Sequence, residues 1–243
     1  MELRVLGRME AEDSGGAIEL GPPKQRLALA TLLLHAGEAV STDSLVDVLW
    51  GDQPPASARQ NVHLHIHRLR RALGAERLVT RGRMGYRLLL SRGDLDAYRF
   101  VDLVDEAQQA SDHGRAAVLI REALAEWRGG AFADFHDHPV LVTEVARLAE
   151  LRLQAVEYRN DVDLVVGDHL RLVGRLRPLV AEHPYRERLH EQLILALYRS
   201  GRSFEALEAF QDVRRILVDD LGLDPGAHLR ELEKRILDRD PDL

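Results

Sequence analysis

The chain has 243 residues, of which 45% are hydrophobic and 30% are charged, and it contains no cysteine. This composition is typical of a globular protein with its own core, and the lack of cysteine excludes disulfides and thiolate metal sites. The net charge of −7 is uneven, because residues 56–93 hold nine arginines and one glutamate, a net charge of +8. A basic segment of this kind is typical of a surface that binds a polyanion, and the alternative is a solvated face that binds nothing.

The start of the chain, MELRVLGRMEAEDSGG, lacks the basic and apolar regions of a signal peptide. No apolar run approaches the roughly 20 residues that a membrane helix needs. The sequence therefore predicts a cytoplasmic protein that does not act at a membrane.

Short strands and helices are expected in the first 55 residues. The apolar runs LRVL, residues 3–6, and AIEL, residues 17–20, are predicted to be strands, and EAEDSGG between them is predicted to be a turn. GPPK begins a largely buried helix that Gly37 ends, and Ser41 or Thr42 caps a second helix.

The stretch QNVHLHIHRLRRALG, residues 60–74, carries three histidines at every second position. It is either a strand that chelates a metal or a helix. The apolar residues recur at spacings of 4, 3 and 4, which is the pattern of one helical face. These residues are Val62, Ile66, Leu69 and Leu73. The alternating pattern of a strand ends after about six residues, so a helix is predicted from Ala56 to Leu73.

A hairpin is predicted after this helix. The strand-like stretches RLVT and YRLLL flank RGRMG, whose glycines are typical of a turn. Two strands, three helices and a hairpin, in this order, form a winged helix-turn-helix with an extra N-terminal sheet, in which the hairpin is the wing.

From Asp94 onward the chain consists of amphipathic helical segments separated by glycine, proline or polar breaks. The predicted fold class is therefore mainly α. A winged helix-turn-helix with small sheets occupies residues 1–93, and an all-α, tetratricopeptide-like domain occupies residues 94–243. In LALYRSGRSFEALEAF only Ala206 and Phe210 keep the spacing of that repeat, which leaves a plain helical bundle as the alternative.

Enzyme signatures are missing from the sequence. On a helix, His63 and His67 lie one turn apart and could share a metal ion, but no carboxylate lies between Asp52 and Glu76 to complete a catalytic site. Phosphate-loop, dinucleotide-binding and nucleophile-elbow motifs are absent as well. We expect no enzyme activity, no metal and no cofactor, and a metal-dependent enzyme is the rival hypothesis.

With its apolar face inward, the predicted third helix turns outward a set of side chains that suits DNA. Arginine pairs with guanine, asparagine or glutamine pairs with adenine, and an exposed leucine contacts a thymine methyl group. Other basic groups contact phosphates or the minor groove. The DNA-binding residues predicted on these grounds are Gln60, Asn61, Leu64, His65, His67, Arg68, Arg70, Arg71, Arg81 and Arg83. For Leu64 the alternative is packing against a partner domain.

Several stretches resemble one family. LVDVLWGDQPPASARQNVHLHIHRLRRALG, followed by RGRMGYRL, is similar to the OmpR-type DNA-binding domain of the Streptomyces antibiotic regulatory protein (SARP) family. LDAYRF, EALAEWRGGAFADF, VARLAELRLQAVEYR, HPYRERLHEQLILALYRSGRSFEAL and LGLDPGAHLRELEKRIL resemble the bacterial transcriptional activation domain of the same family. The likeness covers nearly the whole chain in order.

The resemblance implies a transcription activator that binds direct repeats in double-stranded DNA as a head-to-tail dimer and recruits RNA polymerase holoenzyme. Its target would be a secondary-metabolite gene cluster, as in antibiotic biosynthesis. By position, Leu64 and Arg68 would reach bases in the major groove, and either Arg81 or Arg83 would reach the minor groove. The positions implied to touch the DNA backbone are His65, Arg70 and Thr80. A repressor with the same fold and a helical protein-interaction scaffold are the alternatives.

Overall fold

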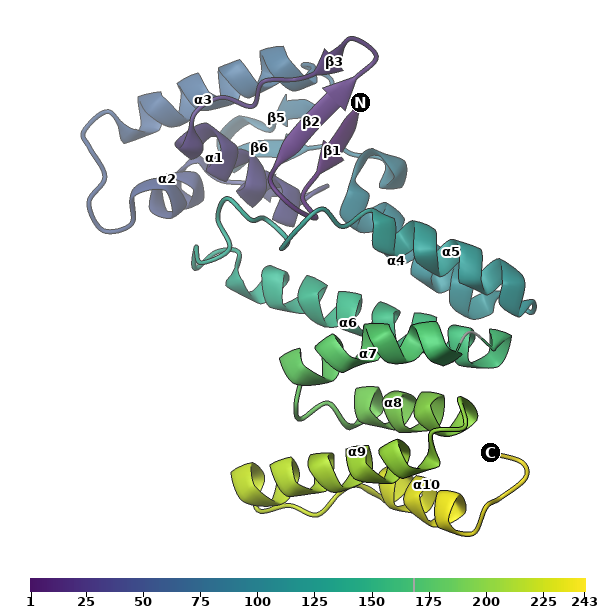
Figure 1. Ribbon diagram of the computed structural model, residues 1–243. Coiled ribbons are helices and arrows are strands. Elements are labelled where there is room, and N and C mark those ends of the chain that lie inside the picture. Colours follow the sequence, from purple (N-terminus) through teal and green to yellow (C-terminus); the bar gives the residue numbers. More distant parts are fainter. Residues whose placement is uncertain (168) are drawn as a thin grey trace. The chain divides into compact units, whose positions relative to one another are not determined.

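The computed structural model describes residues 1–167 and 169–243, and for Arg83 it describes the backbone alone. Small sheets lie in the N-terminal part and helices follow, which confirms the predicted fold class (Figure 1). Contacts divide the chain into two compact units, Met1–Glu106 with Arg121–Leu153, and Ala107–Ile120 with Gln154–Leu243. The predicted boundary between residues 93 and 94 falls inside the first unit, and as a domain boundary it stays a prediction.

The N-terminal sheet is antiparallel, with the order β1 (Glu2–Arg4), β2 (Glu10–Asp13) and β3 (Gly16–Ala17). The predicted turn was wrong in part, because its first four residues, EAED, form β2. The pattern of β2 explains the error, since only Ala11 is buried, opposite Leu3 of β1, and its neighbours are exposed acids. One apolar residue per strand is too weak a signal for a prediction from alternation.

Three helices pack against one another after this sheet: α1 (Pro23–Leu34), α2 (Thr42–Trp50) and α3 (Ala58–Leu73). The side chain of Ser41 caps α2 as predicted, because its Oγ accepts a hydrogen bond from the N–H of Ser44 at 2.9 Å. The inward face predicted for α3 is confirmed, since its four apolar residues are all buried.

A second antiparallel sheet holds the hairpin against these helices. Its order is β4 (Ala39–Val40), β6 (Tyr86–Leu88) and β5 (Leu78–Thr80). Strands β5 and β6 with the 3-10 turn Gly82–Met84 form the predicted wing. Strand β4 was not predicted, because two residues are too few to show a period.

The helices predicted after Asp94 are present. They are α4 (Asp96–Gln109), α5 (His113–Ala125), α6 (Val142–Val166), α7 (His169–Glu182), α8 (Glu187–Arg199), α9 (Ser203–Ile216) and α10 (Ala227–Leu237). In the second unit α7, α8, α9 and α10 stack on one another, with Ala206 and Phe210 buried in α9 (Figure 1). Among the described residues no helix combines the length and the apolar character needed to cross a bilayer.

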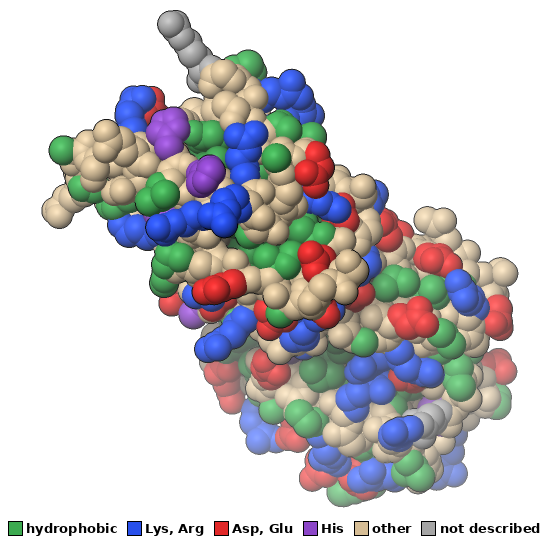
Figure 2. All heavy atoms as spheres, turned by 90° about the horizontal axis from the view of Figure 1, so that it is seen from above, with side chains coloured by type: hydrophobic (Ala, Val, Ile, Leu, Met, Phe, Trp, Pro, Cys, Tyr) green, Lys and Arg blue, Asp and Glu red, His purple; other side chains and the backbone are tan. Residues whose placement is uncertain are grey.

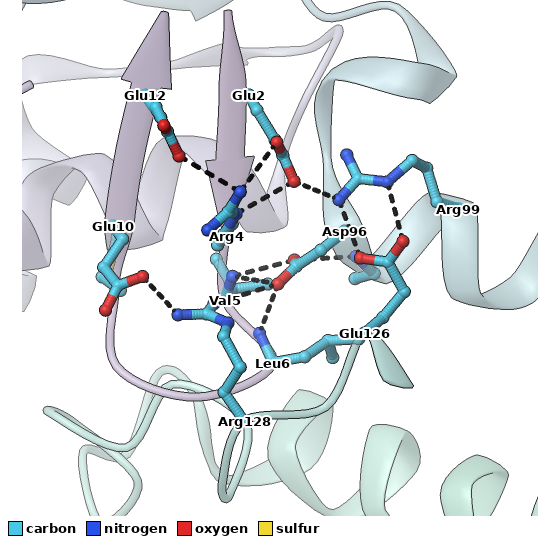
Figure 3. A network of polar contacts seen from close by, with 12 residues as sticks. Glu2, Arg4, Val5, Leu6, Glu10, Glu12, Asp96, Arg99, Glu126 and Arg128 are labelled. Carbon is cyan, nitrogen blue, oxygen red and sulfur yellow. Dashed lines mark hydrogen bonds and ion pairs between the residues drawn. The ribbon is translucent and has the colours of Figure 1, made fainter. Parts of the chain in front are cut away.

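A buried carboxylate ties the N-terminal sheet to the start of α4 (Figure 3). Asp96 is 0% exposed, and its carboxylate accepts hydrogen bonds from the N–H groups of Val5 at 2.8 and 2.9 Å and of Leu6 at 3.0 Å. The N–H of Ala97 and Nη2 of Arg128 donate to it as well, at 2.8 and 3.2 Å. Burial raises the pKa of Asp96, and the donors around it act in the opposite direction.

The segment after α5 runs along the end of β1. The N–H groups of Arg128, Phe132 and Ala133 donate to the carbonyl groups of residues 5–7 at 2.7 to 2.9 Å. Arg99 of α4 bridges the carboxylates of Glu2 and Glu126 at 2.5 and 2.8 Å (Figure 3). The N-terminal sheet, the start of α4 and this segment therefore hold one another in place within the first unit.

The second unit contains a histidine that should make stability depend on pH. His190 of α8 is 5% exposed, its Nε2–H donates to the carbonyl of Pro184 at 2.9 Å, and burial lowers its pKa. An unfolded histidine titrates near its ordinary pKa of about 6.5. Below that pH the unfolded chain binds a proton that the folded chain does not. The free energy of unfolding is therefore expected to fall as the pH is lowered, until the folded pKa is reached.

Urea unfolding of the wild type and His190→Gln, at about pH 7.5 and about pH 5, measures this contribution. Glutamine can still donate to Pro184 but does not titrate, so the variant should lose less stability between the two pH values. His65, whose pKa burial also lowers, is present in both proteins, and its contribution cancels in the comparison. An equal loss in both proteins would contradict the assignment.

Candidate nucleic-acid interface

The outward face of α3, defined here as Gln60, Leu64, Arg68 and Arg71, is exposed along its whole length. Leu64 keeps 43% of its surface exposed, so the structure does not show the alternative in which it packs against another part of the chain. Figure 2 shows Lys or Arg side chains beside histidine side chains over the N-terminal helices. An outward leucine contributes little to the stability of the fold. Among cationic side chains it suits a surface that reads DNA bases.

The arginines of this face, and Arg81 of the wing, have no acidic partner in the part of the chain that the structure describes. Among the residues that the structure describes, no carboxylate pairs with Arg68, Arg71 or Arg81. By contrast, Arg59 of the same helix pairs with Asp43 of α2 at 2.5 Å. An arginine without an internal partner keeps its charge and its planar set of donors for a phosphate or a guanine.

Two side-chain hydrogen bonds join the wing to α3. Nη1 of Arg70 donates to Oγ1 of Thr80 at 3.2 Å, which brings two of the predicted residues together. Oη of Tyr86 lies 2.8 Å from Nδ1 of His63. An α-helix turns by about 100° per residue, so His67, four residues after His63, lies on the same side of α3. The structure therefore joins Arg70 and His63 of this side to the wing.

The opposite flank of α3 holds Asn61 and His65. Nδ2 of Asn61 donates to Oγ of Ser57 at 3.2 Å, which leaves the other polar atoms of the amide available. Burial lowers the pKa of His65, and the charges of Arg68 and Lys24 contribute in the same direction. The neutral form of His65 is therefore favoured.

The tip of the wing depends on one glycine. Arg81 is exposed where the turn begins, and the side chain of the predicted Arg83 lies outside the described residues. Gly85 is buried at a φ of 101°, and a Cβ at this position would overlap the carbonyl oxygen of Val40 and lie 2.7 Å from Cα of Ser41. Only glycine therefore lets β6 approach β4 at this point.

Sequence reasoning missed two contributors to this surface. Lys24 in the first turn of α1 has its Nζ 4.4 Å from the ring centre of Trp50, and its charge acts on His65. The sequence predicts Tyr86 only as a strand residue, although its hydroxyl group reaches His63. A single lysine in an acidic segment and a tyrosine in a strand carry no local signal of these contacts.

Family models match both parts of the chain. Residues 15–88 match "Transcriptional regulatory protein, C terminal" and residues 95–237 match "Bacterial transcriptional activator domain". The chain is 44% identical to the regulatory protein AfsR of Streptomyces coelicolor over 98% of its own length, but it spans only 24% of that relative. It is 38% identical to the regulatory protein DnrI of Streptomyces peucetius, over 99% of this chain and 93% of DnrI.

A solved structure is similar as well. EmbR of Mycobacterium tuberculosis, in complex with a low-affinity phosphopeptide, matches with a TM-score of 0.92 and 33% identity, over 99% of this chain and 65% of that one. The two family matches follow one another in the order that the sequence resemblance implies. The chain belongs to the SARP family of transcriptional regulators, with an OmpR-type regulatory domain followed by a bacterial transcriptional activator domain.

Proposed function

We propose that this chain is a sequence-specific DNA-binding transcription activator that places α3 in the major groove. The observation that carries the proposal is the outward face of α3, where Arg68 and Arg71 have no acidic partner among the described residues and lie beside the exposed Leu64. The opposite face of the same helix is buried, so the outward face is held rigidly toward solvent. A rigid helix that carries base-reading side chains is the usual way in which helix-turn-helix proteins read DNA.

The predicted residues have different roles in this arrangement. Arg68 and Leu64 read bases, Arg68 through guanine and Leu64 through a thymine methyl group. The other residues with groups suited to base edges are Gln60, Asn61 and Arg71. The residues that bind the DNA backbone are His65, His67, Arg70 and Thr80. The wing reaches the minor groove through Arg81 or Arg83.

The complex that we propose contains two protomers, head to tail on a direct repeat near a promoter. Residues 94–243 carry 30 acidic and 20 basic residues, so this part is a poor match for DNA and suits contact with another protein. RNA polymerase holoenzyme is the proposed partner of this part. A secondary-metabolite gene cluster is the proposed target, from the family to which the chain belongs.

Selection of bound sequences from a random duplex pool tests the proposal. Two copies of one short motif in the same orientation, at a fixed spacing, are expected to be enriched. An inverted repeat would contradict the head-to-tail arrangement, and no enrichment would favour the scaffold alternative. Transcription in vitro from a promoter that carries the selected site then separates an activator from a repressor.

Substituting Arg68 by alanine is expected to weaken binding to the selected site by about 1 to 3 kcal/mol and to relax the base preference at one position. The affinity of the variant is measured for the selected site and for duplexes in which each position of that site carries each of the four bases in turn. Arg81→Ala is the contrasting variant, because loss of a wing arginine should weaken binding to all sequences alike. An unchanged affinity of Arg68→Ala for the selected site would show that the docking of α3 is wrong.

A further inference from the structure

His63 of α3 is held in a fixed orientation by a buried tyrosine. Tyr86 is 5% exposed and lies in β6, the central strand of its sheet. Its Oη is 2.8 Å from Nδ1 of His63, and the two rings meet edge to face, with centroids 6.2 Å apart and an angle of 82°. The tyrosine cannot swing out of the core, so it restrains the exposed imidazole.

The hydrogen bond also sets the tautomer of His63. A buried tyrosine hydroxyl group needs an acceptor, and among the described residues Nδ1 of His63 is the acceptor that it has. We take the hydroxyl group of Tyr86 as the donor, since a phenol donates more strongly than it accepts, and the proton of the neutral imidazole then lies on Nε2. No described residue accepts a hydrogen bond from this Nε2–H. The chain thus presents a pre-oriented, unused donor on its surface.

The position of this donor identifies its ligand. His63 and Arg70 are seven residues apart on one side of α3, and both are hydrogen-bonded to the wing. With the outward face of α3 in the major groove, the flanks of the helix face the DNA backbone, where acceptors are phosphate oxygens. We propose that Nε2–H of His63 donates to a phosphate oxygen of the DNA and that Tyr86 is its positioning residue. This inference rests on the proposed function of α3.

Methylphosphonate scanning of the selected site tests the contact. Duplexes that each carry one neutral methylphosphonate are bound by the wild-type full chain, His63→Ala, Tyr86→Phe and His67→Ala. His67→Ala is the comparison variant: it removes an exposed histidine one turn farther along the same side of α3, which is itself a proposed backbone contact, so any sensitivity that it loses should be at a different phosphate. For the unmodified site, His63→Ala is expected to lose about 3- to 10-fold in affinity, the effect of one hydrogen bond.

The scan is expected to show one phosphate whose replacement weakens the wild type and His67→Ala but leaves His63→Ala unaffected. Tyr86→Phe should lose part of the sensitivity at that same phosphate, which a purely structural role of the hydroxyl group would not cause. If His63→Ala keeps every sensitivity of the wild type, His63 touches no phosphate. If Tyr86→Phe folds and keeps full sensitivity at that phosphate, Tyr86 does not position the histidine. A wild type that prefers no sequence would contradict the proposed function itself.

Discussion

Replacing Asp96 by asparagine is expected to lower the free energy of unfolding of the first unit by about 2 to 4 kcal/mol, because buried backbone N–H groups would lose a charged acceptor. The carboxylate is fully buried and accepts hydrogen bonds from Val5, Leu6, Ala97 and Arg128. Asparagine has the same shape but only one acceptor oxygen, and its amide N–H groups would face backbone N–H groups. Backbone donors that stay buried without an acceptor are costly.

The measurement is urea unfolding of the full chain at neutral pH, and the matched control is Asp102→Asn. Asp102 lies on the same helix α4 and pairs with Arg92 at 2.5 Å, but both side chains are exposed. Removing an exposed pair should leave the free energy of unfolding nearly unchanged, because solvent screens the interaction. If Asp96→Asn lowers the free energy of unfolding no more than Asp102→Asn does, Asp96 does not hold together the N-terminal sheet, the start of α4 and the segment after α5.

Substituting Gly85 by alanine is expected to lower the free energy of unfolding by about 2 to 4 kcal/mol, from a strained φ and an overpacked contact together. The φ of 101° disfavours any residue with a Cβ, and the added methyl group would overlap the backbone of Val40 and Ser41. Strand β6 would have to move away from β4. Because β6 also carries Tyr86, the wing would lose its alignment with α3, and DNA affinity is expected to fall as well.

Gly82→Ala separates the two causes. Gly82 has a φ of 56°, but a Cβ there would meet nothing within 4 Å. The free energy of unfolding of this variant should therefore fall only by the conformational cost of a positive φ, about 1 kcal/mol, and its DNA affinity should be unchanged. Thermal unfolding and binding to the selected site are the two measurements. Equal destabilisation by both substitutions would contradict the close approach of β6 to β4.

Local patterns account for what the sequence predicted correctly. The inward face of α3 follows from residues three and four positions apart, and the cap at Ser41 follows from its neighbours. The outward face of α3 could be predicted from the same spacing, because the residues that do not belong to the buried face point to solvent. The family resemblance also rests on contiguous stretches of sequence, which need no knowledge of contacts between distant residues.

Contacts between distant residues could not be predicted in this way. Asp96 lies 91 positions from Val5, and neither residue carries a local signal of the other. The partner of His63 on β6 was missed for the same reason, since it depends on how the hairpin folds back onto α3. Strands β2 and β4 are too short to show a period, so their pairing depends on the surrounding structure.

Affinity measured against salt concentration tests the central claim, that α3 and the wing bind DNA, most directly. The wild-type chain is titrated with a duplex that carries the selected site and with a scrambled duplex. The logarithm of affinity is expected to fall linearly with the logarithm of salt, with a slope near −0.9 for each phosphate contacted, while the selected site stays preferred throughout. Affinity that does not depend on salt, or that is equal for the two duplexes at every salt concentration, would contradict the claim.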